Sequence, residues 1–344
     1  MKITDIKISG LWGIYALNWT LKKDVTILSG INGSGKSTIL RAVASLLQGK
    51  PLPNNIASRL NKVDITFNTG KTLSLTVLPG DMEAMEERAK NDRNFSTAFS
   101  SLKEKYKDKL VNGTASLINT QRISVNDSQG GKPVDIETFM KKIHVDFIST
   151  FDCAPSRPDD PDEYLKYLVN SSYSELDRHL DAVIERYKSY QIELSSRMAR
   201  MMSDVDTKEE FDNIRKLSSA RAILQDTMDR LLRESGKHVN REKGDVEFIF
   251  NSDKSSHSYK LLSAGEKQLL LILLTVFMQE GRETILIMDE PEISLHVDWQ
   301  RQLIDTIREL NPNCQIIVST HSPAMILNGW QAAVDNISDL AKQE

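Results

Sequence analysis

The sequence has only two cysteines, the residues that cross-link small secreted folds, and it has no long apolar segment. Its only cysteines, Cys153 and Cys314, belong to no CxxC or Cys/His cluster, so we expect neither a disulfide framework nor a zinc site. The longest apolar run, 269–278, is far shorter than the roughly 20 residues of a membrane span. The N-terminus alternates like a strand and has no apolar signal-peptide core. These absences predict a cytoplasmic protein with reduced thiols and no membrane association.

An excess of charge of one sign is also missing. The chain has 44 Lys and Arg against 48 Asp and Glu, which gives a net charge of -4. Nothing at the level of the whole chain therefore indicates a nucleic-acid binder, and any such contact has to be local. The length of 344 residues exceeds the size at which one hydrophobic core stops growing. We expect two lobes, or one large domain with an insertion.

A glycine-rich motif stands out near the N-terminus. Residues 30–37 read GINGSGKS and match GxxxxGK[ST], with an apolar strand predicted before them and an amphipathic helix after them. The glycines allow positive φ, and successive N–H groups at a helix start form an anion nest. Lys36 supplies a charge for the β and γ phosphates, and the Ser37 hydroxyl is placed to bind Mg²⁺. The motif therefore predicts a site for a nucleoside triphosphate, and the expected nucleotide-binding residues are Asn32, Gly33, Ser34, Gly35, Lys36, Ser37 and Thr38. A glycine-rich helix cap is the alternative, which the strand and helix on either side disfavour.

Acidic residues follow a buried strand far downstream. Residues 284–288 form a continuous apolar run, typical of a parallel strand, and Asp289 and Glu290 come next. At the carboxyl end of such a strand, Asp289 can hold Mg²⁺ and Glu290 can act as general base on the attacking water. A helix and a second strand, 315–320, lead to His321. This βαβ arrangement predicts that His321 lies near Asp289 and can position that water.

The stretch KLLSAGEKQLLLILL, residues 260–274, combines a polar helix start with a helix that is apolar on nearly every face. Ser263 and Glu266 have the spacing of a capping box. Gly265 is unexplained by capping, because glycine in a helix costs about 1 kcal/mol relative to alanine.

Taken in order, these motifs resemble those of the ABC-type ATPases. The resemblance is to the soluble branch with RecF, Rad50, the structural-maintenance-of-chromosomes heads and the OLD-like ATPases, including the PtuA-like and retron-associated subunits of bacterial antiphage defence. The corresponding segments are 30–38 (Walker A), 262–268 (signature), 285–290 (Walker B), 294–298 (D-loop) and His321 (switch histidine). The signature reads SAGEKQ where transporters typically have SGGQ, which argues against a transporter subunit.

This resemblance implies a head-to-tail homodimer that sandwiches two ATP molecules. Ser263, Gly265 and Glu266 would then face the γ-phosphate of the ATP held by a second copy, and a side chain at Gly265 would block that approach. Gln121 is our candidate for the glutamine loop, with a catalytic and Mg²⁺-binding role; a surface amide at a strand end is the open alternative.

Between the two sets of motifs the periodicity becomes helical. Apolar residues recur between 176 and 201 and between 211 and 232, separated by a polar break at 203–208, which predicts a short helical hairpin. The predicted fold is an α/β P-loop ABC-type ATPase head with an antiparallel β subdomain and this inserted short helical hairpin. Its segments are 1–152, 153–244 (a coiled-coil-like hairpin) and 245–344. Residues 215–243 carry eight basic and four acidic side chains, consistent either with a nucleic-acid contact or with a solvated helix face. A second charged segment, 83–109, indicates an exposed helical excursion.

Two functions remain open. The first is a Mg²⁺-dependent ATPase that gates an effector protein, such as a nuclease, in an antiphage defence complex. A chain ending at Glu344 leaves no room for a TOPRIM or HNH domain, so the effector is expected to be a separate protein. The alternative is a RecF- or Rad50-like repair or recombination ATPase that binds DNA. The near-neutral charge and the short hairpin favour the first.

Overall fold

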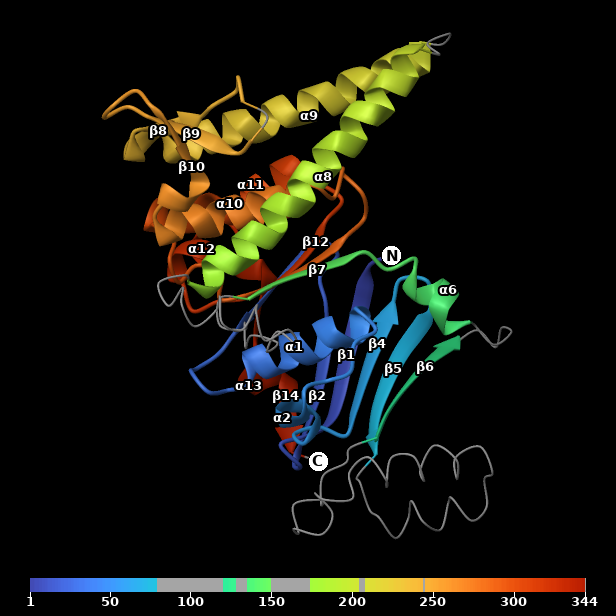
Figure 1. Ribbon diagram of the computed structural model, residues 1–344. Helices are drawn as coiled ribbons and strands as arrows, with labels where there is room; N and C mark the ends of the chain where they lie inside the picture. The colour runs from blue at the N-terminus through green and yellow to red at the C-terminus, as the bar shows by residue number, and fades with distance from the viewer. Residues whose placement is uncertain (79–119, 128–134, 150–173, 204–207, 244, 344) are drawn as a thin grey trace, which may run out of the picture. The chain divides into compact units, whose positions relative to one another are not determined.

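A computed structural model describes residues 1–78, 120–127, 135–149, 174–203, 208–243 and 245–343 (Figure 1). The chain forms two compact units, one of residues 1–23, 33–143 and 336–344, and one of residues 24–32 and 144–335. The helical insertion belongs to the second unit together with the parallel sheet. The predicted segment boundaries at 152/153 and 244/245 therefore do not coincide with the boundaries of these units.

The first unit is built on a six-stranded antiparallel sheet in the order β14-β2-β1-β4-β5-β6. Its strands are β1 (Ile3–Leu11), β2 (Tyr15–Thr20), β4 (Lys62–Phe67), β5 (Lys71–Leu78), β6 (Thr120–Asp127) and β14 (Ala341–Gln343). Its helices are α1 (Lys36–Leu47), α2 (Asn54–Ala57), α6 (Ile136–Met140) and α13 (Ile337–Leu340). Helix α1 contacts β4 and β5 and buries the apolar face that the sequence predicts. This sheet confirms the expected antiparallel β subdomain.

The second unit contains a five-stranded sheet in the order β13-β3-β12-β11-β7. Its strands are β3 (Val25–Ser29), β7 (Val145–Ser149), β11 (Ile285–Asp289), β12 (Gln315–Ser319) and β13 (Val334–Asn336). Strands β3, β12, β11 and β7 run parallel. Every residue of β11 and β12 is buried, as their continuous apolar sequences predict. Helix α11 (Val297–Leu310) connects β11 to β12, and α12 (Pro323–Leu327) follows β12.

Helix α10 (Ala264–Phe277) begins with the predicted capping box. The Ser263 N–H donates to Glu266 Oε2 at 2.7 Å, and the Glu266 N–H donates to Ser263 Oγ at 3.4 Å. Nearly all of the helix behind this cap is buried. The polar start and the apolar continuation are therefore two parts of one core helix.

Two long helices, α8 (Glu175–Ser203) and α9 (Lys208–Leu232), meet at the predicted break and diverge from there (Figure 1). Helix α8 packs mainly against α10, whereas the end of α9 packs against β8, α10 and α11. The two helices were predicted correctly, but each packs against the core of the unit more than against the other. A small antiparallel sheet follows α9, with strands β8 (Lys237–Val239), β9 (Glu247–Phe250) and β10 (Ser256–Ser258). Short 3₁₀ turns cover Arg233–Ser235, Tyr259–Leu261 and Gln331–Ala333.

Some predicted features lie outside the described residues. They are Cys153 with the loop 153–161, the charged segment 83–109 and the strand-like residues 115–119. Cys314 is buried and forms no disulfide with any described residue. Among the described helices, none has a stretch that is both long and apolar enough to span a bilayer.

One buried ion pair joins the start of α10 to β8, and it should make a measurable contribution to stability. Lys237 Nζ lies 2.7 Å from Glu266 Oε2, and the Glu266 side chain is almost fully buried. Burial raises the pKa of Glu266, but hydrogen bonds from Lys237 and from the Ser263 N–H outweigh that effect and leave it below the ordinary value of 4.5. Lys237→Met should lower the free energy of unfolding at pH 7 by about 3–5 kcal/mol, because it leaves a buried carboxylate without its cation.

The pH dependence of this difference follows from the lowered pKa. The stabilisation by Glu266 is complete above its unfolded pKa of 4.5 and is lost as the pH falls through the lower folded value. Urea unfolding at several pH values should show the gap between wild type and Lys237→Met closing in acid. Arg230→Met, which removes an exposed pair with Glu309, is the matched control and should cost less than about 1 kcal/mol. Equal losses of unfolding free energy in the two variants would contradict the view that Lys237 and Glu266 form a buried, stabilising ion pair.

Candidate functional site

Four parallel strands end in one row at the carboxyl edge of the five-stranded sheet. Asp289 of β11 is in register with Ser319 of β12 and Ser149 of β7, and Ser319 is in register with Leu28 of β3. The glycine-rich loop follows β3 directly in the chain. Ligands of open α/β sheets bind at such carboxyl edges, so this row is the candidate site.

Asp289 is fully buried at the end of β11. The Ser319 hydroxyl donates to Asp289 Oδ1 at 2.6 Å, so the neighbouring strand sets the orientation of this carboxylate. Hard oxygen donors of this kind suit Mg²⁺.

Glu290 and His321 face each other at the same edge. Glu290 has a φ of 49°, a left-handed conformation that is uncommon for a non-glycine residue and is often found at functional sites. Its N–H donates to the main-chain oxygen of Ser319 at 3.0 Å. His321 Nε2 lies 3.6 Å from Glu290 Oε1, and both side chains are partly exposed. The prediction that His321 lies beside the acidic residues at this edge is confirmed.

Sequence reasoning assigned no role to Glu292, which is central to this edge. Its carboxylate is buried, and Oε1 accepts hydrogen bonds from the Thr320 hydroxyl and, at 2.9 Å, from the His321 N–H. Gln300 makes a second connection: its amide donates to Leu295 O at 2.8 Å and accepts from the Ser322 hydroxyl. The one available signal was a second acid in the sequence DEPE, which is too common to assign a partner. These bonds join the segment after β11 to the segment after β12.

The start of α10 explains Gly265 within its own chain. A Cβ atom on Gly265 would overlap with the main-chain oxygen of Ser294 and contact the ring of Trp299. The Trp299 Nε1–H in turn donates to Leu231 O at 3.0 Å, so the residues after β11, helix α11 and the end of α9 meet here. Ser263 itself is exposed. The glycine therefore lets α10 approach the 294–298 segment. This packing is a reason for glycine at position 265 that does not depend on a bound phosphate.

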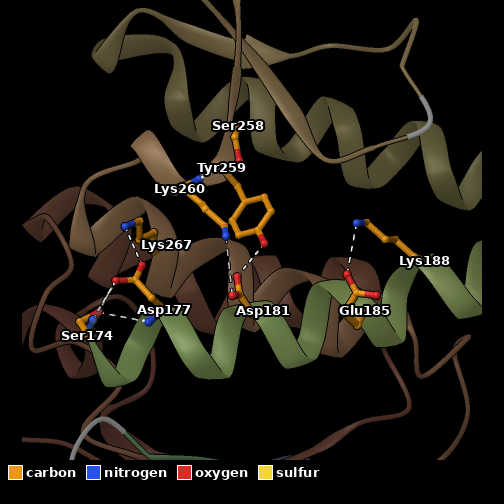
Figure 2. A network of polar contacts seen from close by, with 9 residues as sticks. All are labelled: Ser174, Asp177, Asp181, Glu185, Lys188, Ser258, Tyr259, Lys260 and Lys267. Carbon is orange, nitrogen blue, oxygen red and sulfur yellow. Dashed lines mark hydrogen bonds and ion pairs between the residues drawn. The ribbon is translucent and has the colours of Figure 1, made fainter. Parts of the chain in front are cut away.

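A polar network connects the α10 start to α8 (Figure 2). Lys267 Nζ lies 2.7 Å from Asp177 Oδ1, and the Tyr259 hydroxyl donates to Asp181 Oδ1 at 2.6 Å. Burial raises the pKa of Asp177, but hydrogen bonds from Lys267 and Ser174 outweigh it and keep that pKa below its ordinary value. Helix α8 is thus attached to Tyr259, which precedes the SAGEKQ segment, and to Lys267 within it.

The part of the glycine-rich loop from Gly33 onward, which belongs to the first unit, has the features that a phosphate chain needs. Gly33 and Gly35 have φ values of 78° and 95°, which glycine adopts without strain. Gly35 is the N-cap of α1 and no side chain caps the helix, so its dipole is available to an anion. Lys36 is almost fully buried, and the buried Ser34 Oγ has no hydrogen-bond partner among the described residues. These residues fit a nucleotide phosphate, and the indole of Trp12 packs against Gly35.

Gln121 lies within β6, not in a loop after a strand. Its side chain accepts from the Leu52 N–H at 2.7 Å and donates to Leu52 O at 2.9 Å. Both amide groups are therefore engaged with one main-chain segment, which favours a structural role over the predicted glutamine-loop role.

Several of the basic residues between 215 and 243 have acidic partners. Arg241 contacts Asp226 and Asp229, Arg230 contacts Glu309 at 2.8 Å, and Lys237 binds Glu266. This pairing reduces the positive charge available to a phosphate backbone, and it favours the solvated-face interpretation.

The substitution Gly265→Ala tests whether the packing of α10 against Ser294 requires glycine at this position. Helix propensity alone predicts that Gly265→Ala raises the free energy of unfolding by about 1 kcal/mol. Because the new methyl group would overlap with a main-chain oxygen, we expect the opposite, a loss of about 1–3 kcal/mol in urea unfolding. Ala264→Ser, at the neighbouring exposed position, is the control and should change little. A more stable Gly265→Ala protein would mean that the contact with Ser294 does not require glycine.

Comparison with known proteins is consistent with this geometry. Residues 1–326 match the family model described as an AAA ATPase domain. The Retron Vc95 probable ATPase of Vibrio cholerae is 23% identical, over 93% of this chain and 70% of that protein. The Septu protein PtuA of Bacillus thuringiensis is also 23% identical, over 97% of this chain and 74% of that protein.

The fold is also found in solved structures. An Smc head bound to the C-terminal winged-helix domain of ScpA superposes with a TM-score of 0.53 at 15% identity, covering 95% of this chain and 92% of that one. An Smc head with an extended coiled coil from Pyrococcus furiosus gives 0.51 at 14% identity, covering 95% and 91%. The chain therefore shares the fold of these Smc heads, and it belongs to the AAA ATPase domain family.

Proposed function

We propose that this protein is an ATP-binding and ATP-hydrolysing subunit that gates a partner effector, such as a nuclease, in an antiphage defence complex. The observation that carries the enzymatic part is the pairing of Glu290 with His321 at the sheet edge from which the glycine-rich loop departs. The defence role is supported by the retron and Septu relatives, which match along nearly the whole chain.

The glycine-rich loop binds the phosphates of ATP in this proposal. The buried Lys36 and the N-terminus of α1 supply positive potential, and the Ser34 hydroxyl is available to a phosphate oxygen. Ser37 and Asp289 would hold Mg²⁺, which would neutralise phosphate charge when bound. Ser319 keeps Asp289 oriented for that task.

Hydrolysis depends on the two residues that face each other at the edge. Glu290 accepts a proton from the attacking water, and His321, beside it, orients that water or contacts the γ-phosphate. Glu290 has a left-handed backbone, and its carboxylate lies 3.6 Å from His321 Nε2.

The exposed Ser263 at the start of α10 would contact ATP bound by a second copy of the chain. This head-to-tail arrangement would complete two active sites per dimer. The resemblance of the motifs to those of the ABC-type ATPases supports an assembly of this kind. The same resemblance supports the alternative, a repair or recombination ATPase that binds DNA, although the ion-paired basic residues on α9 and β8 favour the effector-gating function.

Two substitutions test the enzymatic part. Lys36→Ala removes the ammonium group from the phosphate site and should lower ATP affinity at least tenfold by nucleotide titration. Glu290→Gln keeps the shape of the side chain but removes the base, so ATP should still bind while phosphate release slows about a hundredfold or more. Glu309→Gln changes an exposed carboxylate of α11 and serves as the control. Wild-type affinity in the first variant, or wild-type turnover in the second, would refute the corresponding assignment.

The gating role can be tested with the same Glu290→Gln variant. A tagged copy, expressed in its own host with the neighbouring genes intact, should retain its partners in the ATP-bound state. We expect mass spectrometry to find a stoichiometric nuclease or other toxic protein encoded nearby, which the Lys36→Ala control should not retain in the same ATP-dependent way. Recovery of chromosomal DNA and recombination proteins alone would instead support the repair function.

A further inference from the structure

A buried carboxylate binds the main chain of His321 and the side chain of the residue before it. Glu292 is 7% exposed, and its Oε1 accepts from the Thr320 hydroxyl and from the His321 N–H. Its Oε2 is also buried and has no hydrogen-bond partner among the described residues. Burying a carboxylate with half of its acceptors unused is costly. The two hydrogen bonds that Oε1 accepts are therefore the feature that we take this buried carboxylate to provide.

The bonds of Glu292 are part of a closed set around His321. The Thr320 Oγ1 accepts from the Ser322 N–H at 2.9 Å while it donates to Glu292. The Ser322 hydroxyl donates to Gln300, whose amide donates to Leu295 O and, at 3.3 Å, to Glu292 O. The residue before His321, the residue after it and its own N–H are thus all held by the segment that follows β11.

We propose that Glu292 is a positioning residue for ATP hydrolysis, which holds the His321 backbone in register with the Glu290 segment so that the imidazole faces the Glu290 carboxylate. This inference rests on the proposed ATPase function. Glu292 acts through His321 and does not touch the reacting atoms. Its removal should therefore affect the chemical step more than ATP binding.

The expected kinetics separate this role from a general effect on folding. Glu292→Ala removes the acceptor for both donors, so kcat for phosphate release should fall at least tenfold, while ATP affinity stays within about twofold. Glu292→Gln keeps Oε1 as an acceptor and should recover most of the rate. Thr320→Val removes one of the two donors with little change in shape and should give an intermediate loss.

A double-mutant cycle with His321 provides the decisive test. If Glu292 acts through His321, adding Glu292→Ala to His321→Ala should slow phosphate release less than twofold further. The same should hold for Thr320→Val with His321→Ala, which keeps the test available if Glu292→Ala does not fold. Independent, multiplicative losses would overturn the proposal, as would a wild-type kcat in Glu292→Ala. Glu309→Ala, an exposed carboxylate on α11, is the control and should leave kcat unchanged.

The outcome of this test is distinct from that of the proposed function. If wild type does not hydrolyse ATP and Lys36→Ala binds nucleotide as wild type does, the ATPase function itself fails. If Glu290→Gln slows turnover but the Glu292 and Thr320 variants do not, only the positioning role fails. Thermal unfolding of each variant, with equal transition temperatures, excludes loss of folded protein as the cause of a lower rate.

Discussion

The register between β11 and β12 is the constraint on which the candidate site depends. Parallel pairing sets Asp289 beside Ser319, and the two segments that leave these strands carry Glu290, Glu292 and His321. A slip of one residue would turn every side chain of one strand to the opposite face. Such a slip would remove the hydrogen bond between Ser319 and Asp289, and it would separate Glu292 from Thr320. Both strands are buried on both faces, so such a slip would also force the apolar side chains on each face to repack.

Helix α10 connects the carboxyl edge of the five-stranded sheet to the long helices α8 and α9. Its first turn lies against Ser294 through Gly265 and binds α8 through Lys267 and Asp177. Its other end approaches α8 again, since Arg197 Nη1 lies 2.8 Å from Glu280 Oε1 just beyond the helix. Helix α8 is therefore held by side-chain ion pairs at both ends of α10. This attachment explains why the helical insertion belongs to the same compact unit as the parallel sheet.

Local patterns predicted the elements of the site well. The capping box of Ser263 and Glu266, the buried strand before Asp289 and the placement of His321 are confirmed, because each depends on neighbouring residues or on strand polarity. Predictions that required a distant partner did less well. The glutamine-loop role of Gln121 was predicted from its position after a strand-like stretch. In the structure its side-chain amide instead forms two hydrogen bonds with the main chain of Leu52. Glu292 received no role, because its partners lie 28 and 29 residues away.

Residue spacing and local conformational preference were enough to predict the glycine-rich loop, the order of the motifs, the long helices α1, α8, α9, α10 and α11, and the buried strands β3, β11 and β12. Tertiary structure alone decided which donors reach Glu292, which carbonyl oxygen requires Gly265 to be glycine, and which acids pair with the basic residues of α9 and β8. Those outcomes depend on packing between segments that are distant in the chain. Side-chain hydrogen bonds act over about 3 Å, so only the folded arrangement of strands and helices can select the partners.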